Sequence, residues 1–143
     1  VLLDPDGFLT EGTGSNFFLV KNGTIYSPEP RNILRGISRD YVIDLAAELG
    51  IPFQERNLEP YDIMTADEAF FTCTPFSIVP AMRFQGRPIG TGSVGPIYTR
   101  LIDRWSSNVG VDIVGQIQAY AATKSESAAG GATPYQFVAA KHK

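Results

Sequence analysis

The sequence predicts an α/β fold, because segments with the pattern of short strands alternate with segments that have helical periodicity. Two apolar runs, at 16–20 and 68–74, have the length and composition of buried strands. Apolar residues over 37–49 recur at helical spacing, and Pro96 can open a second helix. At 143 residues and 43% hydrophobic content the chain can bury one core, so we expect a single domain over 1–121.

Local signals justify each element of the first half. They are, in order, a turn at 4–7, a buried strand at 16–20, a hairpin turn at 21–23, a returning strand at 24–26 and a loop at 27–32. A helix then starts near Ser38 and stops at Gly50. Its apolar positions are Ile37, Tyr41, Val42, Leu45, Ala46 and Leu49.

The second half continues the alternation and then changes character. The expected elements are a strand at 53–58, a short helix entered at 59–62 and ending near Ala66, strands at 68–74 and 78–84, a turn at 85–86, a glycine-rich link at 90–95 and a helix from Pro96 through Trp105. From Ala122 the residues are small and polar without apolar periodicity. We therefore expect 122–143 to be a linker, a disordered tail or a non-native extension without function.

Composition excludes several classes of function. The net charge of −3, with both signs mixed along the chain, provides no basic stripe for nucleic acid and no polybasic membrane patch. The apolar runs are too short to span a bilayer. One cysteine, Cys73, favours a reducing compartment and hence the cytoplasm. The single histidine, His142, gives no support to a histidine triad or a histidine-rich metal site.

Two further patterns are discounted on their context. The glycines of 90–95 match a dinucleotide-binding spacing, but the strand-helix context and the acidic residue expected about twenty positions later are missing. Asp62, Asp67 and Glu68 form an acidic cluster that could suggest a metal site. Solvated ends of a helix and a strand explain that cluster better.

Three motifs occur in one order: Glu-Gly-Thr-Gly-Ser-Asn at 11–16, Gly-Ile-Ser-Arg at 36–39 and Ala-Asp-Glu-Ala-Phe-Phe-Thr-Cys-Thr-Pro at 66–75. Together they closely resemble the large C-terminal domain of the class IV aminotransferases, which are pyridoxal-phosphate enzymes of the branched-chain and D-amino acid aminotransferase fold. The resemblance covers roughly 1–120. It implies an α/β domain whose mixed sheet is partly closed into a barrel with flanking helices, and it implies pyridoxal 5'-phosphate as the cofactor.

The resemblance assigns the first motif to the cofactor ring. Glu11 would contact the pyridine nitrogen and keep it protonated, so that the ring can accept electrons. The alternative is a surface glutamate in a loop. Gly14 would lie close to the ring and Leu34 against it, although Leu34 could equally belong to the core. Asn16 could simply organise the loop.

The other two motifs would hold the phosphate and the substrate. Gly36, Ile37 and Ser38 would present helix-terminal amides and a hydroxyl to the phosphate, whereas an ordinary N-cap serine is the alternative. In the family, the counterpart of Thr74 supports the phosphate and, with the next residue, offers amides to the substrate carboxylate. Pro75 has no N–H, so the carboxylate must be bound differently, or the substrate is not a branched-chain amino acid.

Two neighbours of these motifs receive no role. Arg39 is expected to be an exposed arginine at the start of the helix. Cys73 is expected to be a small buried residue, because nothing near it in the sequence would activate its thiol.

The resemblance implies a complete enzyme that moves an amino group between an amino acid and a 2-oxo acid, and that is a homodimer. It puts the Schiff-base lysine some tens of residues before Glu11, upstream of Val1, so no catalytic residue is expected within the chain. Lys21, Lys124, Lys141 and Lys143 are its lysines. One alternative is an aminodeoxychorismate lyase of the same family, and another is a truncated domain that folds without catalysis.

Overall fold

The computed structural model describes residues 1–128, which fall into two units along the chain. The first unit, Val1–Gly110, contains the β-sheet and three α-helices. The second begins at Val111, and its described part contains helix α4 (Ile113–Ala128). Among the described residues, no helix is long and apolar enough to cross a membrane.

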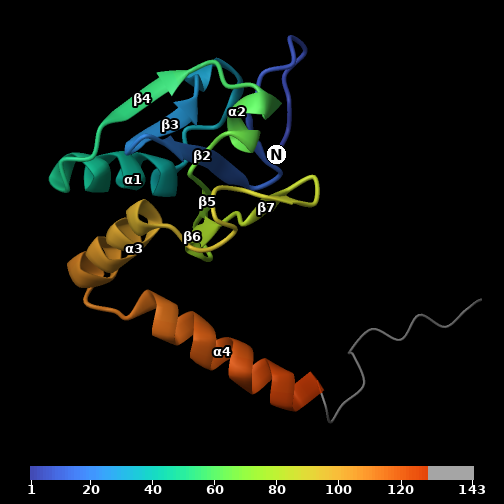
Figure 1. The fold of residues 1–143 in the computed structure, drawn as a ribbon. Coiled ribbons are helices and arrows are strands. Elements are labelled where there is room, and N and C mark those ends of the chain that lie inside the picture. The colour runs from blue at the N-terminus through green and yellow to red at the C-terminus, as the bar shows by residue number, and fades with distance from the viewer. Residues whose placement is uncertain (129–143) are drawn as a thin grey trace, which may run out of the picture. The chain divides into compact units, whose positions relative to one another are not determined.

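Strand β2 (Ser15–Lys21) lies at the centre of the main sheet (Figure 1). The strand order is β4-β3-β2-β5-β6, and β1 pairs with β2 outside this path. The other strands are β1 (Glu11–Gly12), β3 (Thr24–Pro28), β4 (Phe53–Arg56), β5 (Glu68–Cys73) and β6 (Ser77–Pro80). Only the β3–β4 pair is parallel among these strands. The predicted α/β fold with a mixed sheet is therefore confirmed.

The β2–β3 hairpin follows the prediction closely. Lys21 pairs with Thr24 across a two-residue turn, and both turn residues have positive φ, 50° at Asn22 and 75° at Gly23. An Asn-Gly pair adopts this backbone readily, and such a turn matches the twist of the two strands. The hairpin therefore fixes the register of β2 against β3.

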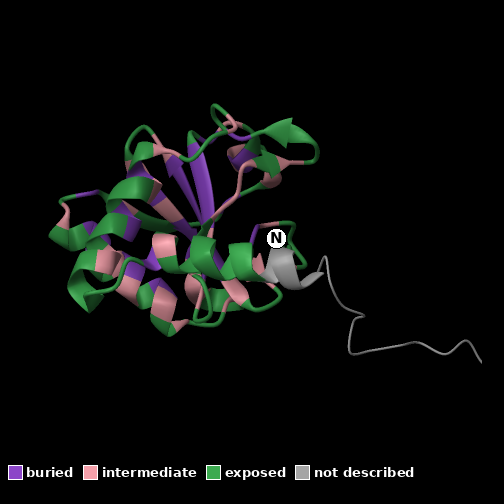
Figure 2. Ribbon diagram, turned by 90° about the horizontal axis from the view of Figure 1, so that it is seen from below, coloured by how far each residue is buried: buried purple, intermediate pink, exposed green. Residues whose placement is uncertain are grey.

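Apolar side chains cover both faces of β2, and Figure 2 shows the buried residues running along the strands. On one face Phe17 and Leu19 belong to a cluster with Leu58 and Ile63, the latter from α2 (Pro60–Met64). On the other face Phe18 stacks on Phe70 with ring centroids 5.1 Å apart. Because the pleat alternates, the even-numbered residues of β2 face α1.

Helix α1 (Ile37–Glu48) was predicted, but its buried face begins two residues later than expected. Ile37 is 88% exposed, whereas Arg39 is only 2% exposed. The expectation of an exposed Arg39 was therefore wrong. Arg39 lies one turn before buried Val42, and its guanidinium pairs with Glu55 of β4 and with Asp40. Burial is tolerated because the charge is paired.

The structure differs from the prediction at 27–32, where regular structure replaces part of a predicted loop, and at 78–84, where two strands replace one. The loop predicted at 27–32 contains the end of β3 and the 3-10 helix η1 (Pro30–Asn32). The single strand predicted at 78–84 is divided into β6 and β7 (Arg83–Phe84). Pro80 is the last residue of β6, although the N–H of Ala81 beyond it still donates to the Ala69 carbonyl at 2.8 Å. Strand β7 turns at 85–86, as predicted, into β8 (Arg87–Pro88).

The acidic residues near these elements serve the fold. Glu68 was expected to be solvated, but it is buried and accepts the N–H groups of Ile97 at 2.9 Å and Tyr98 at 2.8 Å. It thereby caps α3 (Pro96–Val109), the second predicted helix. Asp62 belongs to the capping box of α2. Within 1–128, no group of acidic, histidine and cysteine side chains could hold a metal ion.

The glycine-rich link at 90–95 is shaped by close packing. A Cβ on Gly90 would lie 2.0 Å from the carbonyl oxygen of Asp67, and one on Gly95 would lie 2.0 Å from the Glu68 carboxyl carbon. These two glycines therefore make room for the protein's own atoms.

The C-terminal stretch departs from the expectation of an irregular tail from Ala122. Helix α4 runs through Ala122 and ends at Ala128. The alanine-rich composition of this segment favours a helix without requiring an apolar stripe, which is why apolar periodicity did not reveal it. The remainder of the predicted tail, including His142, lies outside the described residues.

Candidate functional site

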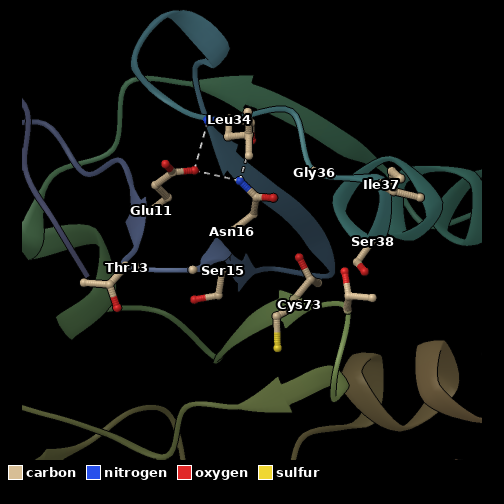
Figure 3. Close-up of a pocket in the computed structure, with 13 residues that line it drawn as sticks. Glu11, Thr13, Ser15, Asn16, Leu34, Gly36, Ile37, Ser38 and Cys73 are labelled. Atoms are coloured by element: carbon tan, nitrogen blue, oxygen red, sulfur yellow. Dashed lines mark hydrogen bonds between the residues drawn. The ribbon is translucent and has the colours of Figure 1, made fainter.

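A cavity of about 220 Å³ opens where β1, the start of α1 and the end of β5 meet (Figure 3). All seven residues that the sequence assigned to the cofactor line it: Glu11, Gly14, Leu34, Gly36, Ile37, Ser38 and Thr74. Pro75, assigned to the substrate, is exposed and is absent from the lining. The fold thus brings together segments that are more than sixty residues apart in the sequence.

The first wall of the cavity carries Glu11. β1 folds back on β2 through a tight turn in which Glu11 pairs with Asn16 and Gly12 with Ser15. Oε2 of Glu11 accepts hydrogen bonds from Asn16 Nδ2 and from the Leu34 N–H, each at 3.0 Å. Both bonds reach the same oxygen, and Oε1 takes part in neither. The carboxylate is therefore held in one orientation with one oxygen available to a ligand.

The second wall is the N-terminus of α1. Gly36 is the N-cap, and within the described residues no side chain caps this helix end. The first N–H groups of a helix have no partner inside the helix, and they carry the positive end of its dipole. Ser38 is half-buried and projects from α1 toward the side of the cavity where Cys73 lies (Figure 3). Leu34 is 75% exposed, which excludes a core role.

The third wall is the end of β5, which contributes Thr72, Cys73 and Thr74. Thr72 is 1% exposed, and its Oγ1 has no hydrogen-bond partner within the described part of the chain. Thr74 is exposed beyond the end of the strand. Cys73 is a free thiol of intermediate exposure at the cavity, so it is less buried than expected. This wall offers two hydroxyls beside the helix terminus.

These walls have opposite electrostatic character. Glu11 supplies negative charge, whereas the start of α1 attracts an anion. A ligand that joins a basic nitrogen to a phosphate therefore fits the chemistry of the cavity. The orphaned Thr72 hydroxyl supports the fit, because a buried hydroxyl without a partner is costly unless a ligand satisfies it.

No lysine lines this cavity among residues 1–123, whose side chains the structure describes. Lys21 lies at the hairpin end of β2, where it donates to the Thr65 carbonyl and its Nζ lies 3.8 Å from Asp67 Oδ1. It is therefore at the opposite end of the strand from Asn16 and the cavity.

Sequence reasoning missed Asn16 as a link between two walls, and it missed Thr72. The signal for Thr72 was its two-residue separation from Thr74, because alternate strand residues share a face. The role of Asn16 depends on the pairing of Asn16 with Thr72 across β2 and β5, which no local pattern specifies.

Comparison with known proteins identifies relatives of this chain. The family model described as amino-transferase class IV matches residues 1–84. The branched-chain-amino-acid aminotransferase of Pseudomonas aeruginosa is 42% identical over 101 residues, which cover 71% of this chain and 33% of that protein. The chain thus spans about a third of the length of the curated relatives that it matches.

Solved structures give the same picture. The T.th. branched-chain amino acid aminotransferase, solved with pyridoxamine 5'-phosphate and also complexed with 4-methylvaleric acid, is 40% identical with a TM-score of 0.69. The match covers 71% of this chain and 34% of that chain. The Escherichia coli branched-chain amino acid aminotransferase is 38% identical, also with a TM-score of 0.69, and the match covers 71% and 35% of the two chains.

Proposed function

Because this chain belongs to the class IV aminotransferases, we propose that it forms the cofactor-binding part of an enzyme that moves an amino group between an amino acid and a 2-oxo acid. The cofactor is pyridoxal 5'-phosphate. The observation that carries the proposal is the cavity in which Glu11 and the uncapped start of α1 form separate walls. The complete enzyme would be a homodimer, with the sheet partly closed into a barrel.

Different residues of the cavity bind the phosphate and the ring of the cofactor. The amides of Ile37 and Ser38 and the hydroxyls of Ser38, Thr72 and Thr74 hold the phosphate. Oε1 of Glu11 would accept a hydrogen bond from the protonated ring nitrogen, while Asn16 and Leu34 keep Oε2 in place. When bound, pyridoxal phosphate supplies an electron-accepting ring for reactions at the substrate α-carbon. The exposed Leu34 side chain, which lines the cavity, would be available to contact that ring.

The substrate belongs near Thr74 and Pro75. Branched-chain amino acids are the first candidates, because the relatives are named for them. Pro75 cannot donate a backbone hydrogen bond to the substrate carboxylate. A lyase reaction of the aminodeoxychorismate type, in which the same cofactor supports an elimination, is the second candidate.

Binding can be tested with the 143-residue polypeptide. Titration with pyridoxal phosphate should shift the amide NMR signals of Ile37 and Ser38, and inorganic phosphate should shift the same signals more weakly. Glu11→Gln should weaken pyridoxal phosphate more than inorganic phosphate, because only the ring meets Glu11. Signals of Ile37 and Ser38 that do not move at millimolar pyridoxal phosphate would refute the site.

Turnover is a separate question from binding. We expect the 143-residue polypeptide alone to show no transamination above free cofactor, because no described lysine side chain reaches the cavity. Incubation with pyridoxal phosphate, branched-chain amino acids and 2-oxoglutarate measures this directly. Aminodeoxychorismate replaces the amino donors in the lyase assay. Steady product formation would show that another group performs the proton transfers.

A further inference from the structure

The amide of Asn16 joins two walls of the cavity. Its side chain is buried, and Nδ2 donates to the Leu34 carbonyl at 2.7 Å and to Oε2 of Glu11 at 3.0 Å. The Leu34 N–H donates to the same Oε2. A side-chain amide has two N–H groups, so both are used here. Glu11, Asn16 and Leu34 therefore form one closed hydrogen-bonded arrangement, drawn with dashed lines in Figure 3.

The oxygen of the same amide, Oδ1 of Asn16, lies beside Gly36 at the start of α1. A Cβ built on Gly36 would lie 2.4 Å from Oδ1 of Asn16, which is closer than real side-chain contacts allow. Gly36 has φ −74° and ψ 143°, a conformation open to any residue. The glycine is therefore required for space rather than for backbone freedom. Asn16 occupies the distance between Glu11 and the helix N-terminus.

We propose that Asn16 is a positioning residue that sets the separation between the Glu11 carboxylate and the N-terminus of α1. Nδ2 fixes Oε2 of Glu11 and the 34–36 backbone, and Oδ1 sets how closely Gly36 approaches. A single side chain thereby sets the distance that a ligand must span in order to contact both Glu11 and the start of α1. The inference rests on the proposed function, because that function supplies a ligand with a ring nitrogen and a phosphate.

A purely structural asparagine would act differently. Its removal would lower the free energy of unfolding and weaken every ligand in proportion to the unfolded fraction. A positioning role instead concerns how well the two ends act together. When the contacts at both ends of the cavity are pre-organised, a ligand that reaches both gains binding free energy from both, and a change in their spacing removes part of that gain. The ligand that spans the cavity should therefore be affected most.

The test compares three probes: inorganic phosphate, pyridoxine, which has the ring without the phosphate, and pyridoxal phosphate. In Asn16→Ala, phosphate affinity should fall less than about threefold, whereas pyridoxal phosphate affinity should fall more than about tenfold, a loss of about 1.4 kcal/mol. Urea unfolding identifies conditions in which each variant is folded. Asn108→Ala, which removes an asparagine of α3 bonded to Tyr41 and Glu48, is the matched control and should bind all three probes as wild type does.

Gly36→Ala tests the spacing without removing the buried amide. It should weaken pyridoxal phosphate about tenfold in the wild-type background and less than about threefold when Asn16→Ala has already removed Oδ1. Additive losses would overturn the inference, since independent effects of the two sites add. The amide NMR signal of Leu34 should shift in Asn16→Ala but stay in place in Asn108→Ala.

Two outcomes separate the inference from the function on which it rests. Wild-type protein that binds pyridoxal phosphate, together with an Asn16→Ala variant that binds it equally well, would overturn the inference alone. Wild-type protein that binds none of the three probes would overturn the proposed function and the inference together. Should Asn16→Ala not fold, the Gly36→Ala comparison between pyridoxal phosphate and inorganic phosphate decides, and equal losses would overturn the positioning role.

Discussion

Replacing Thr72 by valine should make the free protein more stable and its ligand complex weaker. The substitution keeps the branched shape and exchanges a hydroxyl for a methyl group. Oγ1 of Thr72 is buried at the cavity without a partner in the described residues, so the free protein loses no hydrogen bond. If a bound phosphate is what satisfies this hydroxyl, the complex loses one.

The two effects can be estimated separately. A buried polar group left unsatisfied costs about 1–3 kcal/mol, and the free energy of unfolding should therefore rise by about 1 kcal/mol in Thr72→Val. A hydrogen bond to a charged group contributes about 1.5–3 kcal/mol. Since each 1.4 kcal/mol is about tenfold in affinity, pyridoxal phosphate and inorganic phosphate should both bind about 10- to 100-fold more weakly.

Urea unfolding of the free protein and ligand titration by NMR measure the two quantities on one sample. Thr24→Val, at the hairpin end of β3, controls for the loss of a threonine hydroxyl away from the cavity and should change neither affinity. A Thr72→Val variant with unchanged affinity for phosphate would refute the assignment. A lower free energy of unfolding would show instead that the hydroxyl is satisfied within the fold.

Three further substitutions or titrations probe the scaffold. Glu55→Gln should lower the free energy of unfolding in thermal or urea melts, because it leaves the buried guanidinium of Arg39 with a weaker partner. The loss should be limited to about 1–2 kcal/mol, since the Glu55 side chain is partly solvated. Glu68→Gln should cost about 1 kcal/mol, measured in the same way, because one carboxylate oxygen no longer accepts an N–H of α3. Burial raises the pKa of Tyr98 above its ordinary 10.0. The contribution of Tyr98 to the free energy of unfolding should therefore be complete below pH 10.0 and decline as the pH rises through the higher pKa. A spectroscopic titration of the phenol measures the pKa, and Tyr98→Phe should remove the decline.

Local signals were sufficient where an element is specified by neighbours in the sequence. The Asn-Gly turn gave the β2–β3 hairpin, and the glycine at 50 marked the end of α1, where its φ is 64°. Partners far along the chain decided the features that were missed. Arg39 is buried because Glu55 lies beside it, and Glu68 is buried because α3 starts above it. Neither partner can be identified from spacing.

The site shows the same division between local and distant information. The resemblance selected the three segments that meet at the cavity, and the structure brings those segments together. The contacts between the segments required the register of β2 against β5. That register pairs Asn16 with Thr72 and puts both side chains on the face that meets α1. A motif names the residues at a site, whereas strand pairing determines which of them touch.

Helices α1 and α3 begin in the same way, but only the first N–H groups of α3 have a carboxylate partner. Each has a glycine as N-cap, Gly36 or Gly95, and neither has a capping side chain at that residue. At α3 the carboxylate of Glu68 occupies the position that an external anion would take, so the protein supplies its own counterion there. At α1 the nearby carboxylate of Glu11 is turned toward Asn16 and Leu34 instead. Under the proposed function, the phosphate of the cofactor would therefore meet open N–H groups at α1, whereas the corresponding groups of α3 already have a carboxylate as partner.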